Sequence, residues 1–225
     1  MENLIFSLNA TIPIFLMMLL GMLFRKLGWM DEVFAAKMNK FVFLVPLPVL
    51  LFEQLATVDF SEVWDIKFIL FCFVVTAISI TISTLISLLW KDRSIKGEFI
   101  QATYRSSAAL LGIAFIQNIY GTAGMAPLMI IGSVPLYNVF AVIVLTFESG
   151  HTGTDSSANI RKAFINILKN PIIIGIVLGL IASFINLPLP GIVSKSINNL
   201  AVMTSPLALI SIGASFEGRK ALAKL

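Results

Sequence analysis

Cysteine, histidine and charged residues are scarce in this sequence. Of the 225 residues, one is cysteine, one is histidine and 12% are charged, whereas soluble domains carry about 25% charged residues. Cys72 has no partner for an internal disulfide and lies in an apolar run, where packing is its ordinary role. His151 has no second histidine with which to form a metal site or a catalytic triad. We therefore expect no enzyme, no bound metal and no cofactor.

Apolar residues make up most of the sequence. They make up 58% of the chain, and the mean hydropathy is +0.95. A helical membrane span needs about 20 mostly apolar residues, and seven segments meet or approach that length: 5–24, 35–55, 67–90, 99–119, 125–147, 166–187 and 195–215. The composition therefore predicts an all-α polytopic membrane protein. Its net charge of +4 fits membrane topology better than nucleic acid, so the lipid bilayer is an expected partner and nucleic acid is not.

The basic residues predict an orientation in the membrane. If the N-terminus faces outside, all 16 lysines and arginines fall on the inner side except Lys67, Lys195 and Arg105. The outer loop after the second span carries acidic residues instead, among them Glu53 and Asp59. By the positive-inside rule the chain is N-out, with its C-terminus inside after seven spans.

An internal repeat organises the chain. Residues 12–52 align with 170–210 at a constant offset of 158, with 7 identities in 41 positions. A chain rich in Leu and Ile yields some matches by chance, but the order of Pro, Gly, Lys and Pro is the same in both copies. The copies are separated by an odd number of spans, so the second would lie upside down relative to the first. Inverted repeats of this kind are typical of secondary transporters.

The repeat divides the chain into three parts. Residues 1–148 form a first five-helix unit, 149–165 form a cytoplasmic linker rich in Gly, Ser and Thr, and 166–225 begin a second unit. A complete second unit would end near residue 306, so we expect five spans followed by the first two spans of a second, incomplete unit. His151 lies in the predicted linker.

The fourth span contains the most suggestive polar residues. Arg105 lies within an otherwise apolar span, where a charge is costly and by default marks a functional site or a charge pair; it would attract an anion. Alternatively, Arg105 lies seven residues after Glu98 and reaches the inner surface by extending its side chain. Ser106 and Ser107 provide hydroxyls for a ligand or bond within their own helix or to a neighbour. Gly112 would allow close helix approach.

Prolines interrupt two other spans at matched positions of the repeat. Pro46 and Pro48 lie in the second span and Pro206 in the seventh, and each removes an N–H donor from the helix ladder. They predict hinges or unwound segments beside a cavity; the alternative is a static kink packed against a neighbour. Asn138, in the fifth span, needs a partner and either bonds a neighbouring helix or contacts substrate.

Several segments together resemble the auxin efflux carrier (AEC) family of permeases, in a bacterial form. They are FLVPLPVLLF, YRSSAALLGIAFIQNIYG, SVPLYNVFAV, NPIIIGIVLGLIASF and SPLALISIGASF. The resemblance implies ten spans in two inverted five-span units, with a scaffold part and a transport part. It further implies that the fourth and ninth helices are broken and cross near the substrate; here the ninth would lie beyond Leu225. Members carry organic anions such as malonate, malate or the auxin indole-3-acetate.

The family's crossing helix usually has asparagine followed, seven residues later, by proline. Those positions correspond here to Ser107 and Ala114. Both departures weaken the case that this chain breaks its fourth helix or binds the usual substrate there. Gly112, Gly121, Asn138, Pro206 and Gly213 fit the family pattern.

The sequence thus favours a secondary transporter of small organic anions in the bacterial inner membrane, working by alternating access. The alternatives are a membrane scaffold or sensor that does not transport, a fragment of a carrier, and a sodium-coupled symporter; no acidic residue within a span is a convincing sodium ligand. A homodimer is compatible with the sequence, which leaves the oligomeric state open. Candidate substrate-binding residues are Arg105, Ser106, Ser107, Gly112, Ala114 and Asn138, and candidate hinge residues are Pro46, Pro48, Pro206 and Gly213.

Overall fold

The computed structural model describes residues 2–57, 65–89, 93–121, 125–148 and 165–216. Within these ranges every regular element is a helix, which confirms the all-α prediction. The elements are α1 (Glu2–Lys26), α2 (Glu32–Leu44), α3 (Pro46–Ala56), α5 (Ile66–Ser87), α6 (Arg93–Tyr104), the π-helix η1 (Ala108–Gly112), α7 (Ile113–Tyr120), α8 (Ala126–Glu148), α10 (Pro171–Phe184) and α11 (Gly191–Ser215). The predicted linker lies outside the described residues except for its last position, and so does His151.

Long apolar helices account for the membrane character of the molecule. Among the described residues, three segments are long and apolar enough to cross a membrane: Glu32–Ala56, Ile66–Ser87 and Gly191–Ser215. Large apolar side chains cover their outer faces; on α5, for example, Leu70, Phe71 and Ile78 are each more than half exposed. Apolar side chains are stable in such numbers outside the protein core when lipid surrounds them.

Short polar caps fix where three of the helices begin. Asp31 accepts a hydrogen bond from the backbone N–H of Phe34 (2.6 Å) at the start of α2, and Asp65 accepts two at the start of α5. Asn170 accepts from the N–H of Ile172 (3.0 Å) at the start of α10. These side chains satisfy donors that a helix leaves free in its first turn.

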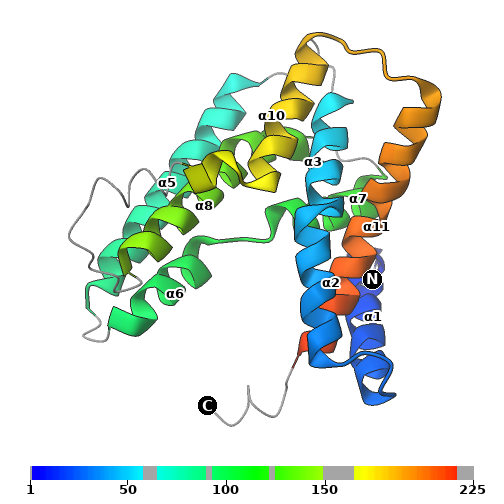
Figure 1. The fold of residues 1–225 in the computed structure, drawn as a ribbon, viewed down its shortest axis with the longest axis horizontal. Coiled ribbons are helices and arrows are strands. Elements are labelled where there is room, and N and C mark those ends of the chain that lie inside the picture. The colour runs from blue at the N-terminus through cyan, green and yellow to red at the C-terminus, as the bar shows by residue number, and fades with distance from the viewer. Residues whose placement is uncertain (1, 58–64, 90–92, 122–124, 149–164, 217–225) are drawn as a thin grey trace.

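The helices form two groups (Figure 1). One group contains α5, α6 and α8, and the other contains α1, α2, α3 and α11, with α10 packed mainly against α3. The chain between α6 and η1 runs from the first group toward the second, and α7 contacts α1 there. The fourth predicted span therefore belongs to both groups.

Glycines allow the closest helix contacts in the second group. A Cβ added at Gly21 of α1 would overlap the carbonyl oxygen of Ile210 on α11. A Cβ at Gly179 of α10 would lie 2.8 Å from the carbonyl oxygen of Phe52 on α3. Real Cβ atoms do not approach backbone oxygens so closely, so both contacts require glycine.

The matched prolines have different effects on their helices. In the second span, α2 ends at Leu44 and α3 begins at Pro46, with Val45 outside helical geometry between them (φ −124°, ψ −72°). In the seventh span, α11 continues through Pro206 and Gly213 to Ser215, so no segment unwinds there and that expectation is corrected. The helix α11 has 25 residues and continues despite the one N–H that Pro206 removes. Pro46 and Pro48 instead lie in the first turn of α3, where proline is favoured and a new helix begins.

Candidate substrate site

The fourth span is broken, as the family resemblance implies and despite the departures at Ser107 and Ala114. α6 ends at Tyr104, residues 105–107 are not helical, and η1 begins at Ala108. The carbonyl oxygen of Ser107 accepts hydrogen bonds from the N–H groups of both Leu111 (2.9 Å) and Gly112 (3.1 Å). The second of these spans five residues, as in a π-helix, a form that occurs often at functional sites.

Packing, not proline, accounts for the break. The side chain of Tyr104 is buried with Ile80, Ile100 and Val144, and its ring lies 5.9 Å from that of Tyr137. The Tyr104 hydroxyl also donates to the carbonyl oxygen of Tyr137 at 3.4 Å. These contacts hold the end of α6 against α5 and α8, so the chain must leave the helix in order to reach the second group.

A cavity of about 340 Å³ lies beside the break. The α6–η1 segment contributes one wall, α8 a second, and the interruption between α2 and α3, together with α10, a third. The lining residues are Phe43, Leu47, Arg105, Ser106, Ser107, Val134, Tyr137, Asn138 and Ile172. The interruptions of the second and fourth spans therefore meet at one cavity.

Hydrogen bonds hold the polar side chains of this cavity in place. The oxygen atoms of the Ser106 and Tyr137 hydroxyls lie 3.1 Å apart. Asn138 is buried; its amide donates to the carbonyl oxygen of Val134 (2.9 Å), and its own oxygen accepts from Asn170 at 3.4 Å. Asn138 thus connects α8 to the start of α10, across the two halves of the predicted repeat.

The charge of the cavity is positive. Arg105 is the only charged residue among the described residues that line it, and its side chain is exposed to the cavity region. Phe43, Leu47 and Ile172 supply an apolar wall. A guanidinium with neighbouring hydroxyl and amide groups is chemically suited to a carboxylate, and an apolar wall is suited to a carbon skeleton.

The predicted site residues fall into three places. Arg105, Ser106, Ser107 and Asn138 line the cavity together, and Pro46 and Pro48 lie directly beside it at the start of α3. Gly112 is not among the lining residues and ends the π-helix; Ala114 lines a different cavity. Pro206 and Gly213 lie within α11, where Gly213 packs against the backbone of Met18 on α1.

Sequence reasoning missed Tyr137 and the two apolar residues from the second span. Tyr137 directly precedes Asn138, and a tyrosine hydroxyl inside an apolar run needs a partner, so the signal was present. Phe43 and Leu47 carry no such signal, because apolar residues fill every span.

The comparisons with known proteins agree with the membrane architecture. A family model described as a membrane transport protein matches residues 6–224, nearly the whole chain. No curated protein sequence matches. The match confirms the resemblance to the auxin efflux carriers. Together with the apolar helices it establishes that the chain belongs to this family of membrane transport proteins.

Proposed function

We propose that the protein is a secondary transporter that carries small organic anions, such as carboxylates, across the bacterial inner membrane. The observation that supports this most strongly is the cavity beside the broken fourth span, where Arg105 is the one charged lining residue within the described ranges. The charge of an arginine within a membrane span is energetically costly unless it is paired. A bound carboxylate would neutralise it. The hydroxyls of Ser106 and Tyr137 and the Asn138 amide would orient the anion.

An inverted repeat would explain how such a site opens to either side. Adding 158 to Gly21 and subtracting 158 from Ile210 converts their contact into the observed contact between Gly179 and Phe52. In Figure 1, α2 and α3 run toward the top of the view and α11 runs toward the bottom, as two inverted copies would. These paired contacts support a pseudo-two-fold relation between residues 1–148 and the unit that begins at 166.

The division into two helix groups supports alternating access. The glycine contacts pack α1 against α11 and α3 against α10 too closely to slide. The group of α5, α6 and α8 reaches the cavity through residues 105–107 and α8. We propose that this group moves against the other, with an N-out orientation that keeps most basic residues inside.

The test is uptake of a panel of labelled carboxylates into proteoliposomes that contain the purified protein. Wild type is compared with Arg105→Ala, Arg105→Lys and Lys40→Ala, the last removing an exposed cation of α2 that does not line the cavity. A hydrogen bond to a charged group contributes about 1.5–3 kcal/mol, so Arg105→Ala lowers kcat/KM by roughly 10- to 150-fold. Arg105→Lys retains part of the activity, because it keeps the charge but loses the planar fork.

Two results would contradict the proposal. One is wild-type uptake no faster than that of protein-free liposomes for every anion in the panel. The other is uptake by Arg105→Ala equal to that by Lys40→Ala, which would remove Arg105 from the site.

A further inference from the structure

A second cavity, of about 370 Å³, lies beside the later turns of α3. Its lining residues come from α3, α7 and α11 and from Thr57 after α3: Leu50, Glu53, Gln54, Thr57, Ala114, Asn198, Ala201, Val202 and Ser205. Its wall is far more polar than that of the first cavity, because carboxylate, amide and hydroxyl groups make up much of it. The anion cavity uses none of these polar side chains.

Glu53 gives this cavity its charge. It is half-buried on α3 and is the only charged residue among the described lining residues. The helices that form the wall also carry Lys195 on α11 and Tyr120 on α7, but both side chains are exposed and neither lines the cavity. A carboxylate inside a membrane segment needs a partner of opposite charge or a proton.

The neighbouring side chains define the kind of partner. Gln54, Thr57, Asn198 and Ser205 offer neutral oxygen atoms from two sides of the cavity. Hard cations prefer such oxygen ligands. With a single carboxylate present, one positive charge balances the site, and no cluster of three acidic, histidine or cysteine residues suited to a metal ion occurs in the described part of the chain.

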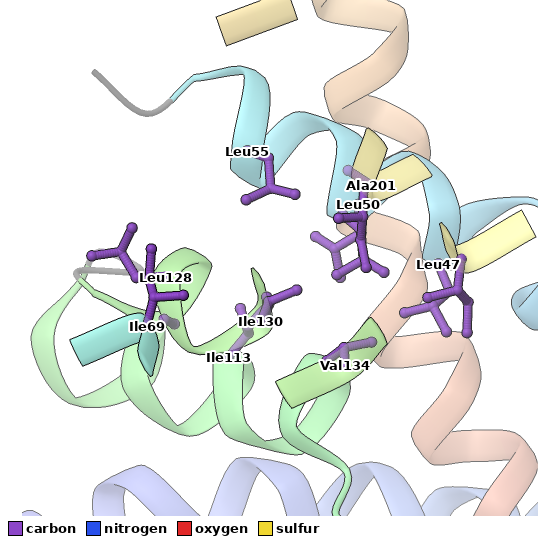
Figure 2. Close-up of a cluster of buried hydrophobic side chains, with 13 residues drawn as sticks. Leu47, Leu50, Leu55, Ile69, Ile113, Leu128, Ile130, Val134 and Ala201 are labelled. Atoms are coloured by element: carbon purple, nitrogen blue, oxygen red, sulfur yellow. The ribbon is translucent and has the colours of Figure 1, made fainter. Parts of the chain in front are cut away.

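Two elements connect this cavity to the anion cavity. On α3, Leu47 lines the anion cavity and Glu53 the second one, six residues or about 9 Å further along the helix. On the broken fourth span, Ser107 lines the first cavity and Ala114 the second. One buried apolar cluster includes Leu47 from the lining of the first cavity, Leu50 from the lining of the second, and Leu55 of α3 (Figure 2). These leucines lie across from residues of α7 and α8, labelled as Ile113, Ile130 and Val134.

From this arrangement we infer a cation site: one monovalent cation, a proton or Na⁺, neutralises Glu53 in the second cavity. The inference that this site is coupled to anion transport rests on the proposed function. The broken fourth span belongs to both helix groups and lines both cavities, so a movement between the groups would displace Ala114 at the second cavity and change the exposure of Glu53 to water. An unneutralised carboxylate opposes that change, because a charge is costly to desolvate. Occupancy of the cation site therefore permits the movement that carries the anion.

The experiment measures anion uptake by proteoliposomes under three conditions: an inward Na⁺ gradient at equal pH, an inward proton gradient without sodium, and neither gradient. Wild type is compared with Glu53→Gln, which removes the charge, and with Glu53→Asp, which keeps a carboxylate. Glu98→Gln is the matched control, because Glu98 is an exposed glutamate of α6 outside both cavities. Size-exclusion profiles establish that each variant is folded.

One of the two gradients is expected to raise the initial rate of wild type and of Glu98→Gln. Glu53→Gln loses that stimulation, and Glu53→Asp keeps part of it. Stimulation by the sodium gradient identifies Na⁺ as the cation, and stimulation by the pH gradient identifies the proton. The inference is overturned if neither gradient changes the initial rate of wild-type uptake, or if Glu53→Gln is stimulated as strongly as wild type.

A direct binding measurement separates this inference from the proposed function. If wild type transports no anion, radioactive Na⁺ binding and the infrared signal of a protonated carboxyl are measured on the purified protein. A signal of either kind that is present in wild type and in Arg105→Ala but absent in Glu53→Gln supports the cation site without transport. Absence of both signals in wild type overturns it.

Discussion

Tyr137 joins the broken fourth span to α8 by two separate contacts. Its hydroxyl lies 3.1 Å from the Ser106 hydroxyl oxygen, and its backbone carbonyl accepts from Tyr104. The backbone contact survives any side-chain change, whereas the hydroxyl contact does not. The hydroxyl of Tyr137 can therefore be removed while the contact between Tyr104 and the Tyr137 backbone is kept.

Tyr137→Phe is expected to weaken anion uptake moderately. Loss of a neutral hydrogen bond costs about 0.5–1.5 kcal/mol, so KM rises roughly 2- to 12-fold. The measurement is the concentration dependence of uptake, with Tyr120→Phe as control, because Tyr120 is an exposed tyrosine outside both cavities. Equal KM values for the two variants would exclude the Tyr137 hydroxyl from the site.

Charge and polarity made part of the site predictable from the sequence. Arg105, Ser106, Ser107 and Asn138 are polar residues in apolar spans, and the structure places them around one cavity. Glu53 was counted with the acidic residues of the predicted outer loop, although the predicted second span ran to residue 55. The structure places it within α3, which ends at Ala56.

At the scale of the helix, glycine contacts hold the second helix group together. Gly21 and Gly179 occupy matched repeat positions, and each lies against a backbone carbonyl of a neighbouring helix. Alanine normally stabilises a helix relative to glycine by about 1 kcal/mol. Here the added Cβ enters occupied space, so the sign of the effect should reverse.

Gly179→Ala is expected to lower the free energy of unfolding by about 1–3 kcal/mol, the usual cost of overpacking. The added Cβ would lie 2.8 Å from the Phe52 carbonyl oxygen and 2.9 Å from the Leu55 Cβ. Thermal unfolding in detergent measures the change. Gly191→Ala serves as control, since nothing lies within 4 Å of its added Cβ; if both variants matched wild type, the close contact would not constrain α10 against α3.

Helix interruptions were harder to predict than helices. The apolar runs predicted the helical segments. The family resemblance implied a broken fourth helix, the departures at Ser107 and Ala114 weakened that case, and the helix is broken. That break depends on the packing of Tyr104 against residues far away in the sequence. At Pro206 an interruption was predicted and none occurs: α11 continues through this residue to Ser215.

At the scale of the whole molecule, the proposed mechanism requires one wall of the anion cavity to move against another. Phe43 lies on α2, in the group with the glycine contacts, and Ser107 lies on the broken span; both are exposed residues of the cavity lining. If the groups move, a covalent bridge between these two positions must stop the transport cycle.

The most direct test of the account is therefore a reversible cross-link across the cavity. Cys72, the only cysteine, is replaced by alanine, and Phe43→Cys and Ser107→Cys are introduced together and singly. Anion uptake is measured before and after a bifunctional thiosulfonate reagent, and again after reduction. The account predicts that the bridged double variant loses uptake and regains it on reduction, while neither single variant shows this reversible loss. Unchanged uptake by the bridged protein would contradict movement about this cavity.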